Sequence, residues 1–326
     1  PSSEKLAFLM RHDDDPFNRW EASQMLAKRL IFRTIDDGAP KNRNIKIYTE
    51  SLRELLEDEK TDPALLAEIL GLPLETELAD MRKPVNIDGI HIARETIRKQ
   101  IANKLEKQLF SLYERHTTQK TYRYTAIQVA QRRLRNVALY YLTALNRHDT
   151  VKIAKTQFDK SSNMTDCMGS LIALNNCCAI ERDEALEIFH RKWQGNSLVI
   201  DKWFTLQATS FKHGTLTRIK ELMQNDEFSI ESPNRVRALI GAFSNSNQIQ
   251  FHAKSGAGYA FLTEQIIELN SINPQIAARL LVPLSHWRHL DEGRQMLVKN
   301  CLEKILSTKE ISRNVFEITT KMLGDD

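Results

Sequence analysis

The sequence of 326 residues contains no apolar run of the roughly 18 residues that a transmembrane helix needs. Its first residues, Pro-Ser-Ser-Glu-Lys, lack the character of a secretory signal peptide. Neither sign of charge dominates, because 46 Lys and Arg stand against 42 Asp and Glu, for a net charge of +4. Such a small excess is weak evidence for a nucleic-acid partner. We therefore expect no membrane and no nucleic acid among the partners.

Cysteine is also scarce, with four residues in the chain. Cys177 and Cys178 are adjacent and no Cys-x-x-Cys pair occurs, which does not fit a disulfide framework. We expect free thiols and a reducing, cytoplasmic compartment. The chain begins at Pro1 rather than at methionine, so either an initiator methionine has been removed or the sequence is part of a longer polypeptide.

Proline is absent from Val85 to Ser232, and strand-like alternation is confined to the short segment Ile45–Tyr48. Both features favour helices over a sheet with proline-marked turns. Helix starts are marked by a capping side chain followed by a proline that has no N–H to lose. These pairs are Asp15-Pro16, Asp62-Pro63, Ser232-Pro233 and Asn273-Pro274. The last two begin roughly 40 residues apart, the length of a two-helix repeat, although no repeated sequence accompanies them.

Apolar residues recur with the 3.6-residue period of amphipathic helices through most of the chain. The first strongly periodic helix is predicted to bury Phe17, Trp20 and Leu26. The segment Asn163-Met-Thr-Asp166 resembles a capping box and predicts another helix start. Further helices are predicted over residues 48–58, 64–70, 90–113, 125–145, 149–158, 182–193, 198–209, 216–224, 292–306 and 312–323.

These features predict an all-α protein in which helical pairs stack into a superhelical array, the α-solenoid architecture of HEAT and armadillo repeats. We expect residues 1–326 to form a single domain. The concave surface of such an array commonly binds a ligand or partner.

Motifs that carry chemistry are missing from the chain. The zinc motif His-Glu-x-x-His, the nucleophile motif Gly-x-Ser-x-Gly and a Walker loop do not occur. His286 and His289 are three residues apart, but no third ligand at zinc-site spacing follows them. The acidic run Asp13–Asp15 lacks the alternating oxygen ligands of an EF-hand. The sequence thus predicts no catalytic residue and no metal or cofactor site within this chain.

The stretch Ser232–Glu264 and the helix start that follows it carry basic side chains. Arg235 and Arg237 lie in the first two turns of one helix, and Gln275 and Arg279 share one face of another. A cation is unfavourable at a helix N-terminus, by roughly 0.3–1 kcal/mol. This placement indicates either an anionic partner such as a carboxylate or salt bridges to a neighbouring helix. Spacing alone leaves both alternatives open.

A second basic cluster consists of Arg132, Arg133 and Arg135. These side chains cannot share one helix face, because consecutive residues lie about 100° apart. We interpret the cluster as a solvated face with one or two ion pairs rather than as a binding patch. RNA binding would require interleaved exposed aromatic residues, which we do not identify here.

Several segments, taken in order, resemble the C-terminal domain of the bacterial aminopeptidase N family, the alanyl aminopeptidase type of gluzincin metallopeptidase. They are Phe8-Leu-Met-Arg-His12, Arg19-Trp20, Asp62-Pro-Ala-Leu-Leu-Ala-Glu-Ile-Leu70, Arg133-Leu-Arg-Asn136, Asn163-Met-Thr-Asp166, Asp201-Lys-Trp-Phe204, Leu206-Gln-Ala-Thr-Ser210, Pro233-Asn-Arg-Val-Arg-Ala-Leu-Ile-Gly-Ala-Phe243, Phe251-His252, the segment from Gly256 to Leu262, and Asn273-Pro-Gln275. The order and spacing of the set, rather than any one segment, make the resemblance specific. It is weak around residues 41–48, 74–88 and 295–308.

The resemblance implies a terminal helical domain of a four-domain zinc aminopeptidase that removes Ala, Arg, Lys and similar residues from peptide N-termini. The family's zinc motif lies in an upstream catalytic domain, so this chain alone is expected to be inactive and to bind no zinc. The domain is expected to cover the active site and to line a substrate chamber, with Arg237, Gln275 and Arg279, together with Arg235, contacting the peptide. The implied partners are peptide substrates and the catalytic domain of the same polypeptide.

An alternative is an autonomous α-solenoid adaptor that binds a protein or RNA partner in its groove. The reading frame upstream of Pro1 separates the two hypotheses. Several hundred residues containing the zinc motif would indicate the aminopeptidase, whereas a start codon at that point would indicate the adaptor.

Overall fold

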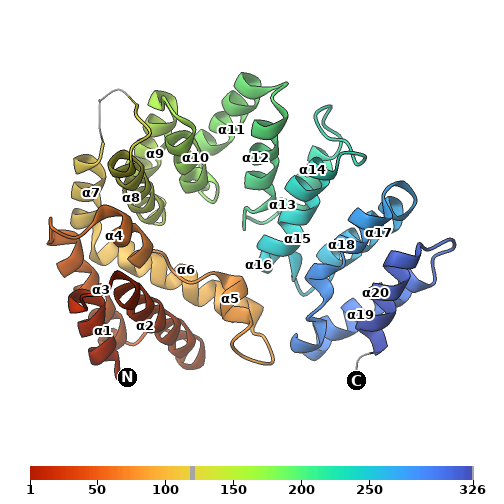
Figure 1. The fold of residues 1–326 in the computed structure, drawn as a ribbon, viewed down its shortest axis with the longest axis horizontal. Helices are drawn as coiled ribbons and strands as arrows, with labels where there is room; N and C mark the ends of the chain where they lie inside the picture. Colours follow the sequence, from red (N-terminus) through yellow and green to blue (C-terminus); the bar gives the residue numbers. More distant parts are fainter. Residues whose placement is uncertain (118–121, 325–326) are drawn as a thin grey trace. The chain divides into compact units, whose positions relative to one another are not determined.

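The computed structural model describes residues 1–117 and 122–324, and every secondary-structure element in these ranges is a helix (Figure 1). The predicted all-α class is confirmed. The chain divides into two compact units. Unit 1 comprises residues 1–78 and 89–188, and unit 2 comprises residues 79–88 and 189–326. The expectation that residues 1–326 form a single domain stays a prediction.

Unit 1 is arranged around α8 (Ala126–Thr143), which packs against α4, α7, α9 and α10. Leu134, Ala138, Leu139 and Leu142 form the buried apolar face of α8. The other helices wholly within the unit are α1 (Ser3–His12), α2 (Pro16–Asp37), α3 (Asn42–Glu57), α4 (Pro63–Ile69), α7 (Glu106–Arg115), α9 (His148–Lys160) and α10 (Met164–Leu174). Most of α5 (Glu75–Ala79), α6 (Ile87–Lys104) and α11 (Ile180–Trp193) also belongs to it. A second group within the unit is formed by α1, which packs against α2 and α3.

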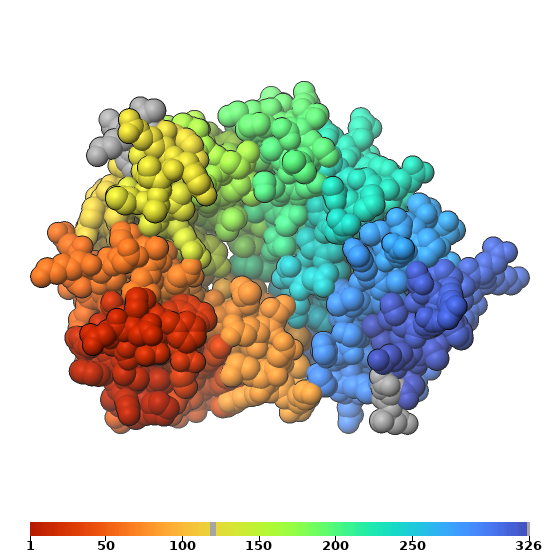
Figure 2. All heavy atoms as spheres, viewed as in Figure 1, coloured from red at the N-terminus to blue at the C-terminus, as the bar shows by residue number. Residues whose placement is uncertain are grey.

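Unit 2 contains short helices followed by longer ones. They are α12 (Ser197–Ala208), α13 (Thr215–Leu222), α14 (Pro233–Val236), the π-helical segment η1 (Arg237–Gly241), α15 (Ala242–Ser246), α16 (Gln248–Phe251), α17 (Ala257–Ile272), α18 (Pro274–Arg279), the 3₁₀ turns η2 (Val282–Leu284) and η3 (Trp287–His289), α19 (Glu292–Leu306) and α20 (Arg313–Gly324). Helix α12 packs against η1, and α17 packs against α18 and α19. Figure 2 shows α17–α20, in blue, as closely packed neighbours.

The capping signals in the sequence locate most of the helix starts. The side chains of Asp15, Asp62, Asn163 and Asn273 each accept a hydrogen bond from a backbone N–H two or three residues further on. Each bond satisfies one of the N–H groups that the first turn of a helix leaves without a partner. Ser232 also precedes a helix, but its side chain makes no capping bond.

Two local predictions were wrong. The helix predicted over residues 90–113 is broken at Leu105, whose side chain is fully buried, so that α6 and α7 are separate. Phe17 is 60% exposed, because it lies in the first turn of α2, and its ring contacts Trp20. In each case packing with distant residues, which the local pattern does not contain, decides the outcome.

Gly258 allows α16 and α17 to approach closely. A Cβ atom at this position would lie 2.2 Å from the carbonyl oxygen of Phe251. Because that oxygen belongs to the backbone, a side chain at position 258 requires the two helices to move apart. The glycine at the end of the Ser255-Gly-Ala-Gly258 segment therefore allows α17 to pack closely against α16.

We expect Gly258→Ala to lower the free energy of unfolding by about 1–3 kcal/mol, as overpacking does in other cores. Urea denaturation followed by circular dichroism measures the change. Gly324→Ala is the matched control, since a Cβ atom there would meet no atom within 4 Å. Equal stability of the two variants would contradict the close approach.

Candidate functional site

The four residues that the sequence singles out for ligand binding lie in unit 2 on two helical segments. Arg235 and Arg237 belong to α14 and η1, whereas Gln275 and Arg279 belong to α18. Arg237, Gln275 and Arg279 are exposed, but Arg235 is only 7% exposed. Burial therefore separates Arg235 from the other three.

Arg235 is held by a set of internal contacts. Its Nε donates a hydrogen bond to the backbone oxygen of Glu227 at 2.7 Å, and its Nη1 donates to that of Ser197 at 2.9 Å. The same Nη1 forms an ion pair with Asp201 of α12, and the guanidinium carbon lies 5.6 Å from the centre of the Phe204 ring. These contacts join α14 to α12. The ion pair with Asp201 is a salt bridge to a neighbouring helix, one of the two alternatives that the sequence left open.

Arg237 begins a π-helical segment, which the sequence did not predict. The backbone N–H of Ala242 donates to the oxygen of Arg237, a bond that spans five residues instead of four. The hydroxyl of Thr205 on α12 donates to the carbonyl oxygen of Ala238 at 3.0 Å. The exposed Arg237 side chain donates from Nη1 to Oδ1 of Asn234 at 2.8 Å. Short π-helical segments occur frequently at functional sites.

Gln275 and Arg279 project from the same face of α18, as the spacing of four residues predicts. The residues between them, Ile276, Ala277 and Ala278, are buried, so α18 is fixed on its apolar side. The side chains of Gln275 and Arg279 form no hydrogen bond and no ion pair with another residue in the described part of the chain. The amide and the guanidinium therefore remain available to a ligand.

A buried polar contact near α16 lies within the resembling segments but received no predicted role. His252 Nδ1 lies 2.8 Å from the hydroxyl of Tyr259, and Arg294 donates from Nε to the backbone oxygen of His252 at 2.6 Å. Arg294 also forms ion pairs with Asp88 and Asp291. Burial, reinforced by the positive charge of Arg294, lowers the pKa of His252 to about 4. The imidazole is thus neutral at pH 7 and joins α16 to α17.

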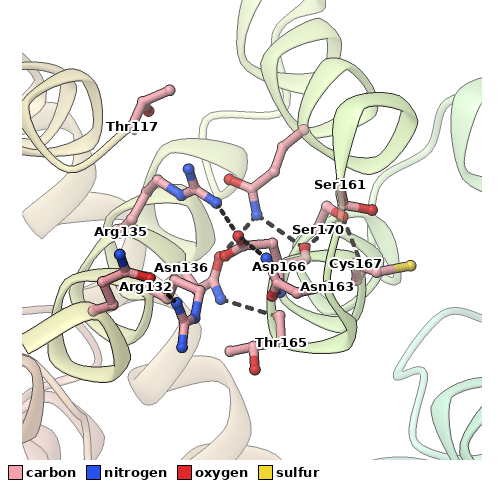
Figure 3. Close-up of polar contacts among 12 residues, drawn as sticks. Thr117, Arg132, Arg135, Asn136, Ser161, Asn163, Thr165, Asp166, Cys167 and Ser170 are labelled. Atoms are coloured by element: carbon pink, nitrogen blue, oxygen red, sulfur yellow. Dashed lines mark hydrogen bonds and ion pairs between the residues drawn. The ribbon is translucent and has the colours of Figure 1, made fainter. Parts of the chain in front are cut away.

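Unit 1 contains a second polar cluster, between α8, α9 and α10 (Figure 3). Arg135 Nη2 and Asp166 Oδ2 form an ion pair at 2.6 Å, with the two side chains 8% and 9% exposed. Asn163 donates to the same carboxylate oxygen at 2.7 Å. Gln157 donates to the backbone oxygen of Asp166 and to the side chain of Asn136. The capping segment Asn163–Asp166 is therefore tied to α8 and α9.

This cluster corrects the interpretation of the three arginines on α8 as a solvated face. Arg132 and Arg135 are buried, and only Arg133 is exposed, in an ion pair with Glu68. The Arg132 guanidinium lies 4.7 Å from the centre of the Tyr122 ring. Because neighbouring helices cover α8 on several sides, most of its polar face is enclosed as well.

Metal-ligating groups do not converge within residues 1–117 and 122–324, where no cluster of three or more His, Cys, Asp or Glu side chains could hold an ion. The centres of the His286 and His289 rings lie 5.4 Å apart, and the rings stack on each other.

Among the helices of residues 1–117 and 122–324, none combines the length and the apolar character that a membrane span requires. Cys167 and Cys177 are buried, while Cys178 is exposed.

We expect Arg235→Ala to lower the free energy of unfolding by about 1–3 kcal/mol, because it leaves the carboxylate of Asp201, whose side chain is 18% exposed, without its buried partner. Arg237→Ala is the control, two residues away on the same segment. It should change stability by no more than about 0.5 kcal/mol, since Arg237 is exposed. Chemical denaturation measures both, and a similar loss in the two variants would contradict the assignment of Arg235 to an internal role.

The lowered pKa of His252 predicts a loss of stability in acid. In the unfolded chain His252 binds a proton below about pH 6.5, whereas in the native chain it does so only below about pH 4. The free energy of unfolding therefore falls as the pH is lowered through this interval. The contribution is roughly 3 kcal/mol at about 1.4 kcal/mol for each pKa unit. Unfolding of the native chain and of His252→Asn at about pH 7 and about pH 5 checks this. The variant should lose less stability in acid, and an equal loss would refute the assignment.

Comparison with known proteins identifies the family. The family model described as "Domain of unknown function (DUF3458_C) ARM repeats" matches residues 3–324. Aminopeptidase N of Escherichia coli (strain K12) is 37% identical over 326 residues, which cover 99% of this chain and 37% of that protein. Aminopeptidase N of Caulobacter vibrioides is 36% identical over 97% of this chain and 36% of its own length.

A solved structure is similar over the same range. It is the crystal structure of Legionella pneumophila aminopeptidase A in complex with aspartic acid, with a TM-score of 0.89 and 28% identity. The match covers 99% of this chain and 38% of that chain, so this chain spans little more than a third of the length of the relatives it matches. The chain belongs to the family of C-terminal ARM-repeat domains (DUF3458_C), and it is similar to that part of aminopeptidase N.

Proposed function

We propose that this chain is the non-catalytic C-terminal domain of a zinc-dependent aminopeptidase, and that it covers the active site and lines the substrate chamber. The observation that carries the proposal is its 37% identity to aminopeptidase N of Escherichia coli over 99% of the chain but only 37% of that relative. The parent enzyme would hydrolyse N-terminal residues such as Ala, Arg and Lys from peptides.

The zinc ion that this function requires does not fit the described residues of this chain, which gather no metal-ligating cluster. The ion would therefore be held by the catalytic domain of the same polypeptide, where it supplies the activated water. This chain's contribution would be to restrict access to the active site and to hold the part of the peptide beyond the scissile bond.

Arg237, Gln275 and Arg279 are the residues that we assign to peptide binding. A guanidinium group matches a carboxylate in two parallel hydrogen bonds, and a glutamine amide both donates to and accepts from a peptide group. The side chains of Arg279 and Gln275 have no hydrogen-bond or ion-pair partner within the described part of the chain, which supports this assignment. Arg235 would act indirectly. Its ion pair with Asp201 fixes the position of α14, and Arg237 follows two residues later as the first residue of η1.

The remaining assignments follow from the same proposal. The partners would be the catalytic domain of the same polypeptide and peptide substrates. The structure of Legionella pneumophila aminopeptidase A in complex with aspartic acid supports an amino-acid ligand for such enzymes. The exposed thiol of Cys178 is in keeping with a reducing, cytoplasmic compartment.

The experiment that tests the proposal compares the complete polypeptide encoded by the reading frame with its Arg279→Ala variant. Loss of one charge-assisted hydrogen bond, worth about 1.5–3 kcal/mol, should raise KM for tripeptides by about 10- to 100-fold. KM for alanyl-p-nitroanilide should change much less, because that substrate has no residue beyond the first. Equal effects on both substrates would contradict a role beyond the first residue.

Two controls accompany this measurement. Arg313→Ala removes an exposed arginine of α20 that pairs with Glu317, and it should leave both KM values unchanged. The 326-residue chain alone should release no product from alanyl-p-nitroanilide. Chelator-sensitive release by the purified chain would refute the non-catalytic assignment.

A further inference from the structure

Unit 1 has an apolar groove that the assignments above do not use. It encloses about 570 Å³ between α8, α10 and the segment after α4. Its apolar lining includes Val129 and Val137 on α8, Met168 and Ile172 on α10, and Leu70 and Leu72 after α4. Two of these side chains are substantially exposed, Val129 at 37% and Ile172 at 47%. Single exposed apolar residues are ordinary, but a contiguous apolar groove indicates an interaction site.

The groove runs along the helix axes. Its α8 wall consists of residues 129, 133, 136, 137, 140 and 141, and its α10 wall consists of residues 165, 168, 169 and 172. Spacings of three and four place each set along one face of its helix. The α8 wall is about 18 Å long, at 1.5 Å for each residue, or about three turns. A groove of this length accepts a helix that presents apolar side chains at positions i, i+3 or i+4, and i+7.

The walls are fixed rather than collapsible. The ion pair between Arg135 and Asp166 ties α8 to α10. At Gly169 the two helices approach so closely that a Cβ atom would lie 2.3 Å from the side chain of Asn136. On the third side, the hydroxyl of Tyr141 donates to the backbone oxygen of Leu70 at 2.6 Å. The groove therefore keeps its shape without an occupant.

The rim carries no charge that is left to attract a charged partner. Arg133 lines the groove and is paired with Glu68, while Arg94 lines it and donates to the backbone oxygen of Pro73. Thr165, Asn136 and the hydroxyl groups of Tyr140 and Tyr141 are the remaining polar groups among the lining residues. An apolar centre with a polar, internally paired rim is the anatomy of a protein–protein interface. A nucleic acid would require unpaired cations instead.

We propose that this groove receives the apolar face of a helix from the catalytic part of the same polypeptide. The inference rests on the proposed function. We choose this occupant because the matched region covers only 36–38% of the length of the relatives, so most of each relative lies outside it. The groove is then an interface within one polypeptide, and Ile172 and Met168 are buried in the complete enzyme.

The test measures the reactivity of a thiol placed in the groove, in the 326-residue chain and in the complete polypeptide. Ile172→Cys is expected to react with a maleimide about tenfold or more slowly in the complete polypeptide, because burial under a partner restricts access. Peptide-level mass spectrometry separates this thiol from the native cysteines. Labelling in denaturant gives the intrinsic rate, which should be equal in the two proteins. Val129→Cys provides a second position on the opposite wall.

A matched pair of substitutions gives an independent readout. Ile172→Glu should lower the Tm of the complete polypeptide by about 5 °C or more, but leave the 326-residue chain unchanged, where this side chain is solvent-exposed. Ile127→Glu is the control, since Ile127 lies on α8, is 71% exposed and does not line the groove. It should leave both proteins unchanged.

Equal labelling of Ile172→Cys in the two proteins would overturn the inference. So would protection in the 326-residue chain that disappears on dilution, because the occupant would then be a second copy of the chain. Peptidase activity of the complete polypeptide is assayed separately. Activity without groove protection would refute this inference alone, whereas protection without activity would refute the proposed function alone.

Discussion

The constraint on which both units depend is that each helix must bury its apolar face against its neighbours. Short amphipathic helices are marginal in water when isolated, and packing supplies most of their stability. In unit 1 this places α8 at the centre, with its apolar residues enclosed by α4, α7, α9 and α10. In unit 2, α17 packs in the same way against α18 and α19. Caps, ion pairs and glycines then determine where each helix begins and how closely it approaches the next.

Two ion pairs that each contain a buried arginine have this role. Arg135 with Asp166 joins α8 to α10, and Arg235 with Asp201 joins α14 to α12. A buried pair adds little net stability relative to an apolar replacement, but removing one partner is costly. Such pairs therefore fix the position of one helix on another. Arg237 and Arg279, by contrast, are exposed. Burial thus distinguishes the structural arginines Arg135 and Arg235 from these two candidates for ligand binding.

In the proposed function, the zinc ion and the hydrolysis of the peptide bond belong to a catalytic domain outside this chain. The described residues gather no metal-ligating cluster, while the arginines and the glutamine of α14–α18 are suited to hold a peptide rather than to cleave it. A helical domain of this kind acts on catalysis through positioning, which contributes by holding the substrate in a reactive geometry. The rigid groove of unit 1 would serve the same end by fixing the domain on its catalytic partner.

The sequence alone determined the all-α class, the helix starts at Asp15, Asp62, Asn163 and Asn273, and the shared face of Gln275 and Arg279, because these depend on residues within a few positions of one another. The resembling segments of the sequence also indicated the family. Only the tertiary structure decided the break at Leu105, the π-helical start at Arg237, and the burial of Arg132, Arg135 and Arg235. A local period shows which face of a helix is apolar, but not which neighbour covers its polar face.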